Sequence, residues 1–153
     1  MQIDCYALNK TSSELAAAKI IAKAYAEGKR LLVRAPDAQI ARALDDFLWT
    51  YDPASFIPHA RRDVVDAENS PVLIVHDAAP QEAKDSRPYL VLLGPADASN
   101  LREFERVFWF FSRFDEAVPA GARELCETER TAGATANFWS QTEKGAFQSE
   151  EKI

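Results

Sequence analysis

The chain has 153 residues, of which 47% are hydrophobic and 27% charged, and its formal net charge is -6 at pH 7. This length and composition predict one globular domain whose core needs neither disulfides nor metal. The acidic balance repels phosphate at long range, which argues against direct, non-specific nucleic-acid binding.

The sequence predicts neither a membrane segment nor a secretory signal. No apolar run approaches the roughly 18 residues that a membrane helix needs. The segment MQIDCYALNK has no basic region and no long apolar core. Two cysteines, Cys5 and Cys126, are too few for a disulfide framework. We therefore expect a cytoplasmic protein without membrane contact.

Apolar runs and helical patterns alternate along the chain. Thr11 and Glu14 fit a capping box at the start of a first helix, and Gly28 fits its C-terminal cap. Asp37 fits the N-cap of a second helix. Further helices are expected at 100–105 and 116–130, and strands at 3–8, 31–33, 72–75, 89–93 and 107–111.

The strands are continuous apolar runs, which is typical of a sheet covered on both faces. They predict an α/β domain of three layers, with a mostly parallel sheet of about five strands and helices on both faces. We assign residues 1–140 to this single domain. The polar residues 141–153 are expected to form a disordered tail.

A parallel α/β sheet raises the question of nucleotide binding. The first strand–helix turn, Leu8-Asn9-Lys10-Thr11-Ser12, has no glycine, although a dinucleotide fingerprint needs several. Lys10-Thr11 resembles only the end of a P-loop. His76-Asp77, at the end of a strand, is the remaining acid–base candidate. A small nucleotide-binding enzyme therefore stays as an alternative, and we expect no cofactor.

Nucleophilic or metal chemistry would have to use the two cysteines and the two histidines, His59 and His76. These residues have no short metal-ligand spacing. Cys5 falls within a strand and Cys126 on the apolar side of the last helix, so both are interpreted as small buried hydrophobes. We expect no metal site and no catalytic residue.

Two aromatic residues stand apart from the predicted core. The helix IARALDDFLW directs a stripe of apolar residues to one side, and Trp49 lands opposite that stripe. Phe56 follows in a loop bounded by Pro53 and Pro58. They suggest an anchor pair for another protein. In the alternative, the helix ends near Leu48 and both rings cover the sheet edge.

Arg123 and Arg130 are seven residues apart and share a face of the last helix. Two guanidinium groups on one stripe can hold a carboxylate, as binding of an acidic peptide tail requires. In the alternative, Glu127 lies between them and satisfies both as surface ion pairs.

The segment LDDFLWTYDPASFIPH, residues 44–59, resembles the chi subunit family of bacterial DNA polymerase III. The segments GKRLLV and FERVFWFFSRFDE, then Arg123 and RTAG at 130–133, keep that family's order and approximate spacing. The resemblance covers roughly residues 28–133. It implies a Rossmann-like α/β fold with no bound nucleotide and no catalysis.

The resemblance also implies two partners in the DNA polymerase III holoenzyme. One is the psi subunit of the clamp loader, to be contacted by Trp49, Phe56 and Pro58. The other is the acidic C-terminal tail of single-stranded DNA-binding protein, to be held by Arg123 and Arg130. DNA would be reached only indirectly. The last helix departs from some members by carrying Glu124, Glu127 and Glu129. A generic interaction module with an unrelated partner is a further alternative.

Overall fold

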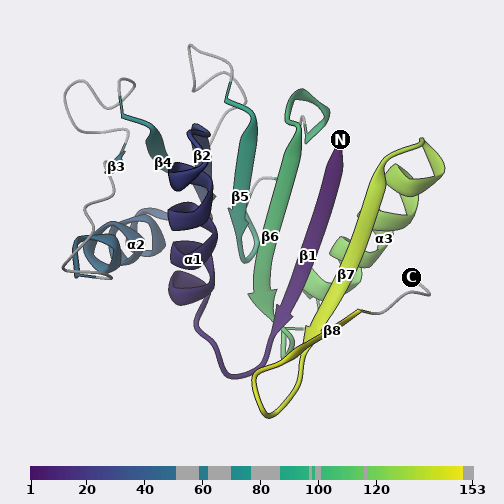
Figure 1. Ribbon diagram of the computed structural model, residues 1–153. Helices are drawn as coiled ribbons and strands as arrows, with labels where there is room; N and C mark the ends of the chain where they lie inside the picture. Colours follow the sequence, from purple (N-terminus) through teal and green to yellow (C-terminus); the bar gives the residue numbers. More distant parts are fainter. Residues whose placement is uncertain are drawn as a thin grey trace.

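The structure, a computed structural model, describes residues 1–50, 59–61, 70–76, 87–96, 98, 101–115 and 117–149. These residues form one sheet with helices packed on it (Figure 1). The helices are α1 (Ser13–Ala26), α2 (Ala38–Thr50) and α3 (Ala117–Thr131), with a short 3₁₀ helix at Leu101–Glu103. The strands are β1 (Gln2–Leu8), β2 (Leu31–Ala35), β3 (His59–Arg61), β4 (Val72–His76), β5 (Tyr89–Leu93), β6 (Arg106–Ser112), β7 (Thr135–Gln141) and β8 (Phe147–Ser149).

The strand order in the sheet is β3-β4-β2-β5-β6-β1-β7-β8. Neighbouring strands pair in parallel throughout, except that β8 runs antiparallel to β7. At the centre, Gln2 of β1 is in register with Arg106 of β6 and Thr135 of β7. Helix α1 lies between β1 and β2, α2 between β2 and β3, and α3 between β6 and β7, as crossovers between parallel strands require.

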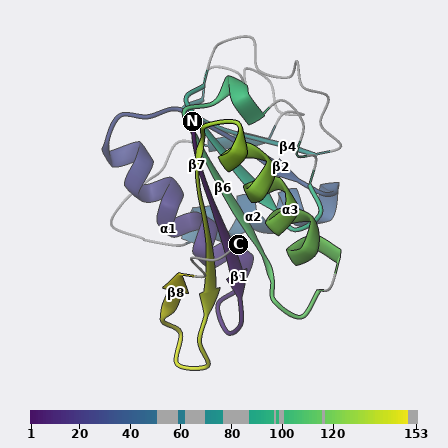
Figure 2. The same cartoon turned by 90° about the vertical axis from the view of Figure 1, so that its right-hand side faces the viewer.

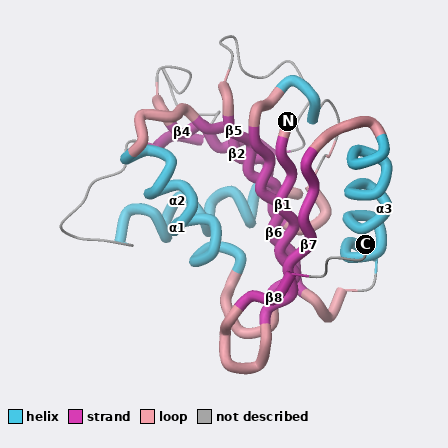
Figure 3. The backbone as a smooth tube through the Cα atoms, turned by 45° about the vertical axis from the view of Figure 1, so that its right-hand side comes forward, coloured by secondary structure: helices cyan, strands magenta, loops and turns pink. Residues whose placement is uncertain are grey.

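The helices cover the two faces of the sheet unequally. α1 and α2 pack on one face, and α3 packs on the other (Figure 3). In β6, Phe108 and Phe110 face the core under α1 and α2, while Trp109 and Phe111 face the core under α3. The three-layer, Rossmann-like α/β prediction is confirmed. No helix in the described part of the chain is long and apolar enough to cross a membrane.

The sheet has eight strands where the sequence predicted about five. All five predicted strands are present, with boundaries shifted by one or two residues at most. The additional strands are β3, β7 and β8. The segment TANFWSQ of β7 mixes polar and aromatic residues, so it lacks the continuous apolar run of the predicted strands. Strands β3 and β8 have only three residues each, which is too short for a sequence pattern to indicate a strand. Pairing with neighbouring strands, and not a local pattern, determines these strands.

The C-terminal residues differ from the disordered tail expected from 141 onward. Gln141 ends β7, and a tight turn leads into β8, where the Thr142 N–H donates to the Ala146 carbonyl at 2.7 Å. Gly145 has a φ of 90°, a backbone conformation that favours glycine. Residues 150–153 lie outside the described part.

The start of α1 also differs from prediction. The N-cap is Ser12, whose hydroxyl accepts from the Leu15 N–H at 3.1 Å, and not Thr11. Thr11 instead accepts a hydrogen bond from Gln141 Nε2 at 2.6 Å. A long-range contact therefore removes Thr11 from the cap. Gly28 follows the end of α1 with a φ of 77°, which confirms its predicted place as a C-terminal cap.

Candidate protein-interaction site

Helix α2 places Trp49 on the outside of the molecule. Asp37 caps this helix by accepting from the Ile40 N–H at 2.8 Å, as predicted. Leu44 and Leu48 on the opposite side are buried. The helix continues to Thr50, so Trp49 lies in its last turn, and 56% of its surface is exposed. The predicted helix face is confirmed.

The neighbours of Trp49 hold it against the sheet edge. Its ring centroid lies 4.9 Å from that of His59, the first residue of β3. The Asp45 carboxylate pairs with His59 Nε2 and with Arg61 Nε, each at 3.0 Å. Because the His59 side chain is fully buried, its ring is a fixed support for the indole. A partner would therefore meet an aromatic surface that is largely preorganised.

Phe56 and Pro58 lie outside the described residues. Their place beside Trp49 stays a prediction. The described residues at either end of this loop are close together, since α2 ends at Thr50 and the ring of His59 contacts that of Trp49. Thr50 and His59, the described residues on either side of residues 51–58, thus both lie near Trp49.

Helix α3 carries the two predicted arginines over β7. Asp115 caps the helix by accepting from the Ala117 N–H at 2.9 Å. The Arg123 guanidinium carbon lies 4.1 Å from the ring centroid of Phe138, and Arg130 donates to the Ala136 carbonyl. Both side chains are thus anchored to β7, and both residues remain exposed.

The structure does not place Glu127 between these arginines as an ion-pair partner. Among the residues that are described, Glu127 has no cation within ion-pair distance. Glu129 instead pairs with Arg102 at 3.0 Å, so its charge is compensated locally. Both arginines are exposed, and the nearby Glu124 and Glu127 reduce the local positive potential.

The two predicted surfaces lie far apart in the sheet order. Trp49 is in the last turn of α2, at the β3 edge, whereas Arg123 and Arg130 are on α3, which packs against β7 on the opposite face. Figure 2 shows the sheet nearly edge-on, with α1 on one side of it and α3 on the other. A single rigid sheet could therefore present two partners with separate surfaces.

The first strand–helix turn is filled by the chain itself. Gln141 Oε1 accepts from the backbone N–H groups of Asn9, Lys10 and Thr11, at 2.9, 3.0 and 3.1 Å. Three N–H groups converging on one oxygen form the kind of backbone nest that binds anions in other α/β proteins. Here a buried amide oxygen from β7 occupies it. This contact opposes nucleotide binding at the usual position, beyond the lack of glycine.

The other catalytic candidates are not assembled by the described residues. Cys5 and Cys126 are both buried, as predicted, with their sulfur atoms 3.4 Å apart. A hydrogen bond to Cys126 and burial together raise the pKa of the Cys5 thiol well above its usual range. His76 is exposed at the end of β4, and Asp77 lies outside the described residues. The described residues contain no group of three or more potential metal ligands.

Pattern reasoning missed the side chains that support the site. Helical periodicity indicates only that Asp45 lies on the polar side of α2, and the sequence presents His59 only as a possible catalytic or metal residue. Their spacing across an intervening loop gives no sequence signal. Gln141 was missed because it falls in residues 141–153, which the sequence predicts to be a disordered tail.

These features define a Rossmann-like α/β domain in which the chain's own glutamine fills the first strand–helix turn. The sequence pattern of the family "DNA polymerase III chi subunit, HolC" matches residues 1–137. The chain is also 31% identical over 120 residues to "DNA polymerase III subunit chi" of Escherichia coli strain K12, covering 78% of this chain and 79% of the relative. The chain therefore belongs to the DNA polymerase III chi subunit family, whose members are generally non-catalytic accessory subunits of the holoenzyme.

Proposed function

We propose that this protein bridges the psi subunit of the clamp loader to the C-terminal tail of single-stranded DNA-binding protein during DNA replication. Membership of the chi family is the observation that carries this proposal. In this role the protein works in the cytoplasm, where the replication machinery is, and has no catalytic residue or cofactor of its own. It reaches DNA only through its protein partners.

The psi contact is assigned to Trp49 with Phe56 and Pro58. Burial of a large, preorganised aromatic ring at the centre of an interface is a common source of binding energy. Trp49 meets this description, because more than half of its surface is available and its ring rests on the fixed ring of His59. The polar pair of Asp45 and Arg61 beside it would form part of the rim.

The acidic tail is assigned to Arg123 and Arg130. Both side chains are held by β7, so little rotamer freedom remains to be lost when a carboxylate binds. Bridging follows from the separation of the two surfaces. With both partners bound, each raises the effective concentration of the other near the clamp loader.

The tail assignment predicts a salt-dependent interaction that requires both arginines. Arg123→Ala and Arg130→Ala should each weaken binding of the tail peptide about tenfold, because each removes a charge-assisted hydrogen bond. Arg42→Ala, an exposed arginine on α2, is the matched control and should change nothing. Calorimetric titration of the peptide at several salt concentrations measures both effects. Affinity that is independent of salt and of both arginines would remove α3 from the tail-binding site.

A further inference from the structure

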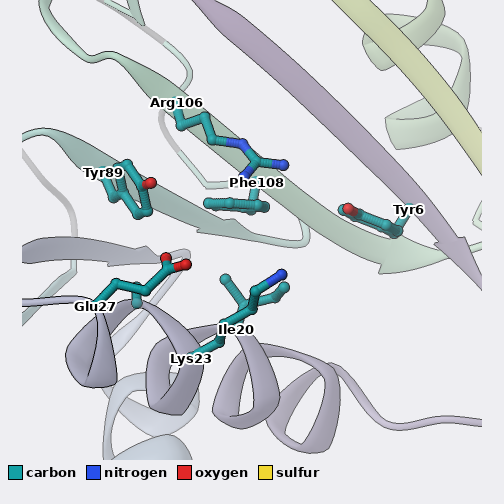
Figure 4. Close-up of a pocket in the computed structure, with 8 residues that line it drawn as sticks. Tyr6, Ile20, Lys23, Glu27, Tyr89, Arg106 and Phe108 are labelled. Atoms are coloured by element: carbon teal, nitrogen blue, oxygen red, sulfur yellow. The ribbon is translucent and has the colours of Figure 1, made fainter. Parts of the chain in front are cut away.

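A cavity of about 110 Å³ lies between α1 and the first residues of β5 and β6. It opens on the sheet face opposite α3, so it is distinct from the surface of Arg123 and Arg130. Its lining includes Tyr6, Lys23, Tyr89, Arg106 and Phe108 (Figure 4). Sites for drug-sized ligands have about 300–1,000 Å³, so this cavity has room for a side chain and not for a nucleotide.

The charges around the cavity are mostly positive. Lys23 projects from the last turns of α1, and within the described part of the chain no carboxylate lies at ion-pair distance from its ammonium group. Arg106 is held by Asp4, whose carboxylate lies 3.1 Å from Nη2. Lys29 lies beside the ring of Tyr89, with Nζ 5.9 Å from the ring centroid. The opposing charges are Asp4, which is paired with Arg106, and Glu27 on the rim.

The aromatic walls disfavour a cationic ligand. The face of Phe108 already carries the Arg106 guanidinium, whose carbon lies 4.6 Å from the ring centroid, and Tyr89 carries Lys29. These cation–π contacts occupy the sites that an ammonium ligand would need. The cavity is therefore better suited to an anionic ligand, whose apolar stem would lie along Phe108 and Ile20.

Tyr6 supplies a second donor beside Lys23. Its ring is fixed by stacking on Phe110 with centroids 4.9 Å apart, and Figure 4 shows its hydroxyl directed toward the cavity. Burial, assisted by the charge of Asp4, raises the pKa of Tyr6 to about 12. The phenol therefore stays protonated at neutral pH and can donate to an oxyanion.

We propose that this cavity binds a carboxylate on an acidic segment of a partner protein, with Lys23 as the ion-pairing residue and Tyr6 as the hydrogen-bond donor. A peptide fits better than an isolated carboxylate because Phe147 lies next to Tyr6, with ring centroids 5.4 Å apart, and is 40% exposed. An apolar residue beside the carboxylate would cover this ring. The net charge of -6 disfavours a polyanionic nucleic acid as the ligand.

The test is a residue-resolved titration, since α3 also carries arginines. The probe is the blocked peptide acetyl-Glu-Glu-Leu-Glu-Glu-amide, followed by backbone amide shifts of the ¹⁵N-labelled full chain. We expect the amides of Tyr6, Lys23 and Arg106 to shift. Lys23→Gln should raise the Kd about tenfold, because the variant keeps the stem and loses the charge. Lys19→Gln, an exposed lysine one turn earlier, is the matched control and should leave the Kd unchanged.

Three results would overturn the proposal. The first is a set of shifts confined to α3, and the second is equal binding of the peptide in which every glutamate is glutamine. The third is a thymidine dodecamer that produces the cavity shifts at lower concentration than the peptide, which would assign the cavity to phosphate. Binding of psi is measured in parallel and should be unchanged in Lys23→Gln. A negative result for the cavity would therefore not contradict the bridging proposal, which the Trp49, Arg123 and Arg130 variants test separately.

Discussion

Trp49→Ala is expected to weaken binding to the psi subunit by at least about 2 kcal/mol, or about 30-fold in Kd. The indole is 56% exposed in the free chain, so its truncation removes contact area that only a partner would cover. Its ring also contacts His59, but the buried residues of α2 lie on the other side of the helix. The folded domain should therefore survive the substitution. Titration of purified psi by calorimetry measures the change.

The matched control for Trp49 is Phe114, which is 71% exposed between β6 and α3. Phe114→Ala removes an exposed aromatic ring far along the sheet order from the β3 edge and should leave psi binding unchanged. Thermal unfolding of both variants checks that the domain is intact. Equal affinity of wild type and Trp49→Ala for psi would remove Trp49 from the interface.

Gln141→Ala is expected to lower the free energy of unfolding by about 2–3 kcal/mol, because it leaves three backbone N–H groups without their acceptor. Gln141 is only 2% exposed, so water cannot replace the amide at little cost. The same change releases the Thr11 hydroxyl and the Gly145 carbonyl from Nε2. Urea unfolding followed by circular dichroism measures the loss.

Two further variants show whether the nest of N–H groups is the cause. Gln39→Ala, on the exposed side of α2, should have little effect on stability. Gln141→Glu keeps an acceptor for the three N–H groups and should be less destabilised than Gln141→Ala at neutral pH. If Gln141→Ala unfolds within about 0.5 kcal/mol of wild type, the contact contributes little and the turn is held by other interactions.

Local signals in the sequence were sufficient for most of the fold. Apolar runs such as Leu31–Val33 identified the central strands, and Asp37 and Gly28 marked helix ends through their own backbone contacts. The pattern failed where a distant segment decides the local structure. Gln141 takes Thr11 out of its expected cap, and β1 pairs with β7, whose polar sequence did not indicate a strand.

In the candidate site, too, features set by local sequence could be predicted and features set by distant segments could not. The exposed face of α2 follows from helical periodicity, so the position of Trp49 could be predicted from the sequence. The residues that support Trp49 could not be predicted, because Asp45 of α2 and His59 of β3 come into contact only in the folded sheet. Likewise, the spacing of Arg123 and Glu127 allowed an ion pair. The structure instead stacks Arg123 on Phe138 of β7, a contact that no local pattern indicates.

In the proposed function, one chain holds two partners at once through separate surfaces. The most direct measurement is light scattering coupled to size-exclusion chromatography of the chain mixed with psi and single-stranded DNA-binding protein. We expect one peak whose mass contains all three proteins, and Trp49→Ala should lose psi from it while keeping single-stranded DNA-binding protein. Mutually exclusive binding, in which either partner displaces the other from the chain, would contradict the bridging function.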